Sequence, residues 1–309
     1  MNIIVTGGAG FIGSHTTDRL IGLGHEVAVI DNLSTGKKSN LNPKASFYDC
    51  DIRDKEVLDI FMEHKPNAVI HDAAQISVRI SVEDPMQDAD INIKGSLNII
   101  EACRKAKVPK FIFASSGGTV YGEQKQFPAE ETHPLAPLSP YGVAKLAVEN
   151  YLYYYNKNYG LDYISLRYGN IYGPRQDPLG EAGVVAIFSK RILEGKDPTI
   201  NGDGRQTRDY VFVGDVVEAN VKALGASYTG PLNIGTSVET DVLGLYGLLK
   251  DISGAGIGKV HGPPKAGEQK RSLLSYNKAK QILGWEPQTG LAEGLSETYE
   301  WFGRQSHKK

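Results

Sequence analysis

The chain has 309 residues, 40% of them hydrophobic, which is enough for one large domain or two ordinary ones with a packed core. Its 34 basic and 36 acidic residues leave a formal net charge of −2, so we expect neither nucleic acid nor an anionic membrane as a partner. Cys50, Cys103 and the seven histidines form no metal-binding pattern and no disulfide framework, so no metal is expected. No apolar run approaches the roughly 20 residues of a membrane span. Because the opening residues MNIIVTGG already have strand character, we expect no signal peptide and a cytoplasmic location.

Six short segments rich in β-branched residues predict strands, most of them followed by a turn and by helical spacing of apolar residues. In chain order they cover residues 2–6, 25–31, 45–49, 67–73, 110–116 and 162–170. A long sheet-packing helix is predicted over residues 85–108. This alternation predicts an α/β fold with a Rossmann-type, doubly wound parallel sheet. From residue 173 onward, Pro- and Gly-rich turns indicate a smaller C-terminal lobe, although strands or helices could cross between the two parts.

A glycine-rich turn, TGGAGFIG at residues 6–13, links the first strand to a helix. Gly7, Gly10 and Gly13 would let the backbone amides and the helix N-terminus approach a pyrophosphate, although the same pattern also occurs in a tight turn without a ligand. Asp31 ends the second strand, where a carboxylate hydrogen-bonds the adenosine ribose diol and repels a 2′-phosphate. Together these features predict that the protein binds NAD rather than NADP.

The stretch SPYGVAK, residues 139–145, places Tyr141 and Lys145 four positions apart and therefore on one helix face. A free tyrosine has a pKa near 10, and a cation one helical turn away stabilises the phenolate and lowers that pKa. Tyr141 could then act as a base near neutral pH. Without the glycine-rich turn, the same two residues would fit an ordinary exposed pair on a helix.

The GxxGxxG spacing, taken with YGVAK downstream, resembles the extended short-chain dehydrogenase/reductase family over nearly the whole chain. The resemblance implies that residues 1–172 form the NAD-binding Rossmann domain and that residues 173–309 form mainly a sugar-nucleotide-binding lobe. It also implies that Tyr141 and Lys145 contact NAD, and that Tyr141 removes a proton from a sugar hydroxyl as NAD accepts a hydride from the same carbon. The other cofactor contacts that it implies, besides the three glycines and Asp31, are Phe11, Ile12, Asn32, Ser34, Thr35, Gly36, Asp51, Ile52, Ala73, Ala74, Gln75, Asn92, Ser115 and Tyr168.

The segment ASSGGTVYG, residues 114–122, departs from the family pattern. Most relatives have Ser or Thr at the position of Gly117, so we predict that Ser116 supplies the catalytic hydroxyl; Ser115 and Ser116 could alternatively cap the strand end. Related dehydratases carry an Asp-Glu pair just before VYG, and decarboxylating relatives carry a Glu at the position of Thr119. Because this chain has Gly118-Thr119 there, the resemblance implies hydride removal and return without a second acid-base step.

Three further segments resemble the substrate-binding parts of nucleotide-sugar epimerases: RYGNIYGPRQ, GDGRQTRDYVFVGD and PPKAGEQKRS. Arg208 suits a diphosphate through its fork of donors, but it would also fit a salt bridge at the rim. The usual arginine of the third segment is replaced by Lys265, so Arg271 could take over its phosphate contact. Ser272 occupies a position that controls entry of N-acetylated sugars in relatives. The full substrate set implied is Ser116, Gly117, Tyr141, Asn170, Asn201, Gly202, Gln206, Arg208, Lys265, Glu268, Arg271 and Ser272.

Among these epimerases, the chain resembles most the shorter UDP-glucose 4-epimerases of bacteria and archaea. The resemblance implies conversion of UDP-galactose to UDP-glucose through a 4-keto intermediate, with NAD as cofactor and a UDP-hexose as substrate. It also implies a homodimer formed partly by residues 141–157, whose tyrosine stripe could equally be core within one subunit. Two alternatives stay open: an epimerase for another nucleotide sugar, such as UDP-glucuronate or a UDP-N-acetylhexosamine, and a non-catalytic dinucleotide-binding sensor.

Overall fold

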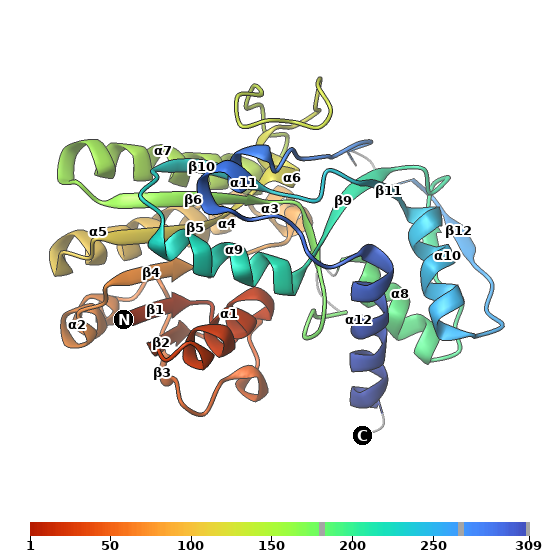
Figure 1. Cartoon of the computed structure of the whole chain (residues 1–309), viewed down its shortest axis with the longest axis horizontal. Coiled ribbons are helices and arrows are strands. Elements are labelled where there is room, and N and C mark those ends of the chain that lie inside the picture. The colour runs from red at the N-terminus through yellow and green to blue at the C-terminus, as the bar shows by residue number, and fades with distance from the viewer. Residues whose placement is uncertain (179–182, 265–268, 307–309) are drawn as a thin grey trace.

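A seven-stranded parallel sheet forms the centre of the computed structural model, which describes residues 1–178, 183–264 and 269–306 (Figure 1). The strand order is β10-β6-β5-β4-β1-β2-β3, and all six neighbouring pairs run parallel. The strands are β1 (Asn2–Thr6), β2 (Glu26–Asp31), β3 (Ser46–Asp49), β4 (Ala68–His71), β5 (Lys110–Ser116), β6 (Asp162–Tyr168) and β10 (Gly230–Ile234). The prediction of a Rossmann-type doubly wound α/β sheet is confirmed. All six predicted strands are present, and their observed first and last residues lie within two positions of the predicted ones.

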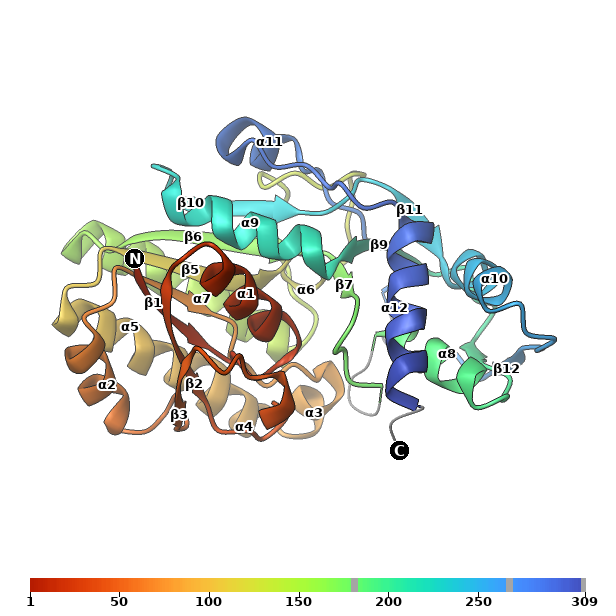
Figure 2. The same ribbon diagram turned by 60° about the horizontal axis from the view of Figure 1, so that its bottom comes forward.

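Helices cover both faces of this sheet (Figures 1 and 2). On one face lie α1 (Phe11–Gly22) and α9 (Val213–Gly225), and on the other lie α2 (Glu56–His64), α5 (Ser96–Ala106) and α7 (Pro140–Tyr159). Alternate residues of one strand enter different cores because strand side chains alternate between faces. In β1, for example, Ile4 packs with the α5 side whereas Val5 packs with the α1 side.

The predicted helix over residues 85–108 is interrupted by a π-helical turn. It consists of α4 (Pro85–Ala89), a π-helical turn η2 (Asp90–Gly95) and α5, and it follows the short helix α3 (Val78–Glu83). Asp84 caps α4 by accepting a hydrogen bond from the Gln87 amide at 2.9 Å. Because π-turns widen a helix locally and occur often at functional sites, the position of Asn92 inside η2 is notable.

The connections reverse direction between β1 and β4. From β1 the chain proceeds through β2 and β3 toward one edge, and from β4 it proceeds through β5 and β6 toward the other. In open α/β sheets, ligands bind beyond the carboxyl ends of the strands at such a switch point. The glycine-rich turn follows β1 at this place. The topology and the sequence motif therefore predict the same ligand-binding position, at the carboxyl end of β1.

The second half of the chain builds a smaller body and also returns to the main sheet. The small body contains the three-stranded sheet β11-β9-β7, the two-stranded sheet β12-β8 and three helices. Its elements are β7 (Asn170–Tyr172), α8 (Val184–Leu193), β8 (Thr199–Asn201), β9 (Thr207–Phe212), β11 (Glu239–Asp241), α10 (Val242–Ser253), β12 (Val260–Gly262) and α12 (Leu291–Ser306). By contrast, α9, β10 and α11 (Asn277–Leu283) pack on the large sheet, so the two halves interleave.

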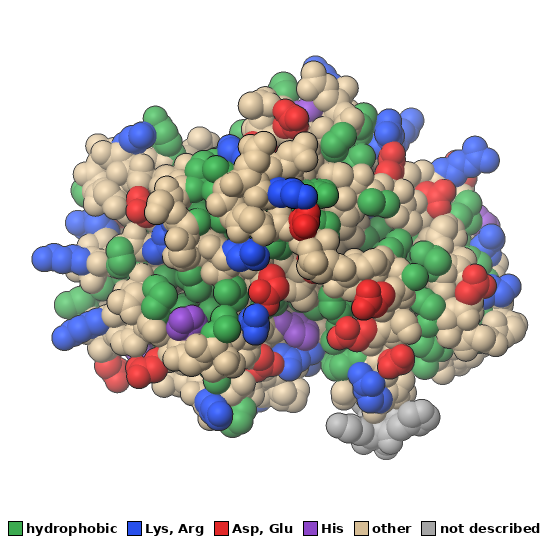
Figure 3. Space-filling model, viewed as in Figure 1, with side chains coloured by type: hydrophobic (Ala, Val, Ile, Leu, Met, Phe, Trp, Pro, Cys, Tyr) green, Lys and Arg blue, Asp and Glu red, His purple; other side chains and the backbone are tan. Residues whose placement is uncertain are grey.

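Charged side chains of both signs are interspersed over the face shown in Figure 3. This distribution agrees with the near-zero formal net charge and shows no single-sign field on that face. Within the described residues, no helix is long and apolar enough to cross a membrane, and no cluster of potential metal ligands is found.

Candidate active site

Close backbone packing explains the three glycines between β1 and α1. Gly7 has φ +72°, and a Cβ there would lie 2.7 Å from the Ala73 nitrogen. A Cβ on Gly13 would lie 2.3 Å from the Gly7 carbonyl oxygen. Gly10 is the N-cap of α1. Because glycine has no side chain, this residue does not cap the first backbone amides of the helix with a side-chain hydrogen bond. This cradle fits a pyrophosphate, and Phe11 and Ile12 begin the helix behind it.

Gly13→Ala tests this cradle. We expect the added methyl to displace the Gly7 backbone, at an overpacking cost of about 1–3 kcal/mol, and to weaken NAD binding about tenfold to a hundredfold. The measurement is the NAD retained per chain after gel filtration, followed by titration of the stripped protein. The matched control is Gly22→Ala in the same helix, where a Cβ would meet nothing within 4 Å. Equal NAD retention by both variants would contradict the assignment.

The carboxylate of Asp31 is fixed at the end of β2. Its Oδ2 accepts a hydrogen bond from the Ala9 amide at 3.0 Å, and its Oδ1 accepts one from the Leu33 amide at 2.8 Å. Burial raises the pKa of this carboxyl, and the two amides act in the opposite direction. A Cβ on Gly36 would lie 2.8 Å from Asp31 Oδ1. The backbone at residue 36 can therefore lie this close to the Asp31 carboxylate because glycine has no side chain. The exposed Ser34 and Thr35 lie between these two residues in the same loop.

The loop after β3 is tied to the loop after β2. Asn32 donates a hydrogen bond to Asp51 Oδ2 at 2.7 Å, and Arg53 donates to Asp51 Oδ1 at 2.8 Å. The Arg53 guanidinium holds the pKa of Asp51 at about 2. Ile52 is buried, and a Cβ on Gly95 of η2 would lie 2.6 Å from its Cδ1. The predicted adenosine contacts after β2 and β3 are therefore brought together.

Asn92 organises the loop after β4. Its Oδ1 accepts a hydrogen bond from the Gln75 amide at 2.9 Å, and its Nδ2 donates to the Gln75 carbonyl at 2.9 Å and to Asp88 Oδ1 at 2.8 Å. The side chain is therefore engaged with the protein itself and holds the backbone of Gln75, the last of the three predicted contacts 73–75, in place. The structure places these residues together, and their contact with a cofactor stays a prediction.

Tyr141 and Lys145 lie one turn apart in α7, beside the end of β5. Ser139 caps the helix by accepting a hydrogen bond from the Gly142 amide at 3.2 Å, which fixes the first turn that carries Tyr141. Lys145 Nζ donates to the Ala114 carbonyl at 2.9 Å and lies 5.6 Å from the centre of the Tyr141 ring. The sequence spacing thus corresponds to a real pair, and the lysine is buried.

Burial dominates the electrostatics of this pair in the protein alone. Burial raises the pKa of Tyr141 well above its usual value, and the nearby Asp88 acts in the same direction. Burial also lowers the pKa of Lys145 to about 8. The expected lowering of the Tyr141 pKa concerns the protein with NAD bound, where a positive nicotinamide ring adds to the charge of Lys145, and it stays a prediction.

The structure distinguishes the candidate hydroxyls at the end of β5. Ser115 donates a hydrogen bond to Glu149 Oε1 at 2.5 Å, so its hydroxyl faces a buried ion pair. A Cβ on Gly118 would lie 3.9 Å from both Ser116 Oγ and Asn170 Oδ1, which places these two polar groups around one point.

Gly117, where relatives carry a hydroxyl residue, is buried against Leu274. A Cβ there would lie 2.5 Å from Leu274 Cδ1 and 3.1 Å from the Arg167 carbonyl oxygen. A serine or threonine would therefore require repacking, which explains the departure. Ser116 stays the predicted catalytic hydroxyl.

Tyr168 ends β6 and packs in the hydrophobic core on the α1 and α9 side of the sheet. Its hydroxyl donates to Asn220 Oδ1 at 2.9 Å, and the residue is buried. Burial raises the pKa of this phenol well above its usual value. Tyr168 is thus suited to packing against a ring and not to proton transfer.

The predicted diphosphate and base contacts come from β7, β8, β9 and the turns between them. Arg208 Nη1 donates to the Thr207 carbonyl at 2.8 Å, and Gln206 Nε2 donates to the Asn201 carbonyl at 3.3 Å. Gly202 has φ +65° in the turn after β8. These residues lie in the smaller body, as does Asn170, which begins β7 shortly after the end of β6.

The remaining substrate predictions have mixed outcomes. Arg271 donates to Glu239 at 2.6 and 2.9 Å and stacks on Phe127 at 3.8 Å, so its guanidinium is already engaged. Ser272 is buried, and its Oγ has no hydrogen-bond partner within the described residues. Lys265 and Glu268 lie outside the described residues.

Sequence reasoning missed two buried features of this region. One is the carboxylate of Asp72, directly after β4, whose signal was an acidic residue at the carboxyl end of an apolar strand. The other is the Glu149–Arg167 ion pair behind β5 and β6, at 2.6 Å. No spacing rule connects those two residues, because they meet only through the packing of α7 on β6.

The glycine-rich turn at the switch point and the Tyr-Lys pair beside it define a dinucleotide-dependent enzyme of the Rossmann class. A family model described as "NAD dependent epimerase/dehydratase family" matches residues 3–235, and the chain belongs to this family. NAD is accordingly its cofactor, which confirms the prediction from Asp31 and the glycines.

Three relatives span nearly the full length of the chain. A putative UDP-glucose 4-epimerase of Methanocaldococcus jannaschii is 49% identical over 97% of each chain. The structure of a UDP-glucose 4-epimerase from Thermotoga maritima, solved with UDP-glucose, has a TM-score of 0.98 and 52% identity, covering 99% of this chain and 100% of that one. The Thermus thermophilus UDP-glucose 4-epimerase, solved in complex with NAD, has a TM-score of 0.93 and 47% identity, covering 98% and 99%. The resemblance inferred from the motifs is confirmed.

Proposed function

We propose that this enzyme interconverts UDP-galactose and UDP-glucose by epimerisation at C4. The observation that carries the proposal is the Tyr141–Lys145 pair held against β5, the strand that ends at Ser116, combined with the absence of a carboxylate at Gly118 and Thr119. A site built this way can move hydrogen to and from one carbon, and it lacks the acid-base pair that elimination of water would require. The names of the relatives at 47–52% identity support the same substrate class.

In the proposed mechanism, the chain's own residues handle the proton and the positioning. When bound, NAD supplies a positive charge and accepts, then returns, the hydride of the sugar carbon. Tyr141 takes the proton of the 4-hydroxyl, and Lys145 stabilises the phenolate that results. Ser116 hydrogen-bonds the reacting sugar oxygen. The sugar therefore passes through a 4-ketose, and the overall conversion involves no net oxidation.

Inversion at C4 requires that the 4-ketose presents its opposite face before hydrogen returns. We place the fixed end of the substrate at Asn170 and Arg208, where an amide and a guanidinium suit a diphosphate. With the diphosphate held there, the sugar can turn about its tether without leaving the site. Gln206, Asn201 and Gly202 lie on the same small body and are assigned to the nucleoside end.

The direct test is to incubate the purified protein with UDP-galactose, without added cofactor, and to identify the product. UDP-glucose is expected. A panel with UDP-glucuronate and UDP-N-acetylhexosamines decides between this substrate and another nucleotide sugar. Binding of NAD without turnover of any member of the panel would instead support a non-catalytic sensor.

We also expect UDP-N-acetylgalactosamine to be accepted. Ser272 is the residue at the position linked to sugar size, and its side chain is small and buried. We predict a kcat/KM within a thousandfold of that for UDP-galactose, and Ser272→Tyr should remove activity on the N-acetylated sugar preferentially. A greater loss in the unmodified protein would contradict this prediction.

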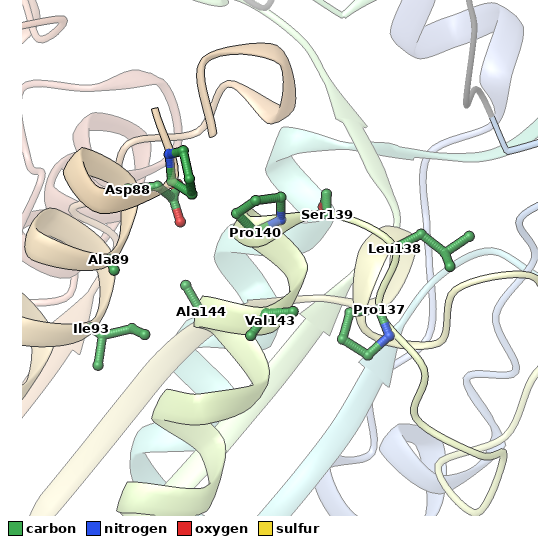
Figure 4. Close-up of a pocket in the computed structure, with 10 residues that line it drawn as sticks. Asp88, Ala89, Ile93, Pro137, Leu138, Ser139, Pro140, Val143 and Ala144 are labelled. Carbon is green, nitrogen blue, oxygen red and sulfur yellow. The ribbon is translucent and has the colours of Figure 1, made fainter. Parts of the chain in front are cut away.

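A homodimer through α7 is the proposed assembly. Of the tyrosine stripe on this helix, Tyr155 enters the core, whereas Tyr151, Tyr153, Tyr154 and Tyr159 are 40–57% exposed. Next to the helix start lies an apolar pocket of about 500 Å³ (Figure 4). It is lined by Pro85, Asp88, Ala89, Ile93, Pro137, Leu138, Ser139, Pro140, Val143 and Ala144, none of which belongs to the proposed substrate site. Exposed aromatic side chains and an apolar pocket on the same helix are typical of an interface.

We retain the division into residues 1–172 for NAD and 173–309 mainly for the sugar nucleotide, with α9, β10 and α11 crossing back to the large sheet. We also propose a cytoplasmic location, because Cys50 and Cys103 are buried free thiols.

A further inference from the structure

Asp72 lies beside the glycine-rich turn and has no role in the mechanism described above. It directly follows β4 at the switch point of the sheet, and its amide donates to the Thr6 carbonyl at 3.1 Å. A Cβ on Gly7 would lie 3.0 Å from the Asp72 carbonyl carbon. The residue is therefore part of the floor on which the glycine-rich turn rests.

The carboxylate of Asp72 is buried without partners. Both of its oxygens are inaccessible and accept no hydrogen bond from the described part of the chain. The preceding side chain shows the opposite situation, because both ring nitrogens of His71 are hydrogen-bonded, to Thr6 Oγ1 at 2.6 Å and to Ser96 Oγ at 2.9 Å. Since an unpartnered buried carboxylate is costly, its presence at a ligand crevice indicates a group that is satisfied by the ligand.

Two titratable side chains interact electrostatically with this carboxylate. Lys145 comes from α7 and lowers the pKa of Asp72, while Asp72 raises the pKa of Lys145 in return. Tyr168 comes from β6, and Asp72 raises its pKa. Burial is the larger effect and raises the pKa of Asp72 to about 7, so the carboxyl changes charge near neutral pH.

We propose that ionised Asp72 is a counter-charge for the oxidised nicotinamide of bound NAD and makes the protein prefer the oxidised cofactor. The inference rests on the proposed placement of the cofactor across Gly7, Ala73 and Tyr168. Oxidised nicotinamide carries a positive charge and reduced nicotinamide carries none, so a buried anion stabilises only the oxidised form. An epimerase needs this preference, because cofactor left reduced after the loss of a keto sugar cannot begin another cycle.

The test measures cofactor selectivity and does not depend on turnover. Holoenzyme is equilibrated with a fixed mixture of NAD and NADH at several pH values between about 6 and 8.5, and the bound forms are quantified after gel filtration and denaturation. As pH rises, the bound ratio of oxidised to reduced cofactor should increase about tenfold, which corresponds to a difference of about one unit in the Asp72 pKa between the two complexes. Asp72→Asn, which keeps the shape and removes the charge, should flatten this dependence and favour NADH.

The proposal would be overturned by an unchanged pH dependence in Asp72→Asn, or by a pH-independent ratio in the unmodified protein. Asp88→Asn is the control, because Asp88 also acts on Lys145 but hydrogen-bonds Gln75 and Asn92. Because Asp88→Asn lowers the pKa of Lys145, a dependence that came from Lys145 would shift to lower pH in this control, and such a shift would mean that the proposal is wrong. Melting curves verify that each variant folds.

The bound ratio of oxidised to reduced cofactor is measured without a sugar nucleotide. A failure of the UDP-hexose assay would therefore be distinguishable from a failure of the cofactor-selectivity test.

Discussion

Tyr141→Phe should reduce kcat for UDP-hexose epimerisation by roughly 10³-fold, within the 10²–10⁴-fold range typical of a general acid-base group. The phenyl ring keeps the packing of the first turn of α7, so the loss reports the missing hydroxyl. Since Lys145 Nζ is held by the Ala114 carbonyl at 2.9 Å, the lysine should stay in place in this variant. The measurement is the initial rate of UDP-galactose conversion at saturating substrate.

The control for this substitution is Tyr151→Phe. Tyr151 lies on the same helix, and its side chain is 40% exposed, so loss of its hydroxyl should leave kcat within a factor of two of the unmodified enzyme, because exposed substitutions of this kind have effects of roughly 0.5 kcal/mol or less. NAD retained after gel filtration should be the same in both variants. If Tyr141→Phe kept full activity, the proton would be carried by another group and the proposed mechanism would be wrong.

Much of the nucleotide-binding half was predictable from the sequence, because each of its signals is local. The six strands were recognised from β-branched runs, and the spacing of Tyr141 and Lys145 placed them on one helix face, as the structure confirms. The glycine-rich turn was equally local, since its packing depends on residues next to it and on the start of the following loop.

Features that depend on tertiary packing were not predictable. The return of β10 to the large sheet has no local signal, because its pairing with β6 joins segments more than 60 residues apart. The conflict between Gly117 and Leu274 requires knowledge of a segment far along the chain. The burial that raises the pKa of Tyr141 in the polypeptide alone was also not predictable, because the sequence places a lysine one turn away but does not reveal how far the phenol is desolvated.

Substituting Arg167 should destabilise the protein strongly, although this residue does not belong to the predicted catalytic or binding set. Its guanidinium donates to both oxygens of Glu149, at 2.6 and 3.0 Å, and to the Tyr121 hydroxyl at 2.9 Å. The two charged side chains are only 3% and 8% exposed. Among the described residues, Arg167→Met would leave a buried carboxylate that accepts a hydrogen bond only from Ser115, and we expect a loss of about 3–5 kcal/mol in the free energy of unfolding, measured with urea.

The exposed pair Arg104–Glu101 provides the matched control, since its side chains are 36% and 34% exposed and 2.8 Å apart. Arg104→Met should cost less than about 1 kcal/mol, because solvent screens such pairs. A second variant, Arg167→Met combined with Glu149→Gln, removes the uncompensated charge and should recover part of the loss. Recovery would show that the cost arises from the buried carboxylate. A loss in Arg167→Met no greater than that in Arg104→Met would instead mean that α7 and β6 do not depend on this pair, and Ser115 would then need another explanation for facing away from the crevice.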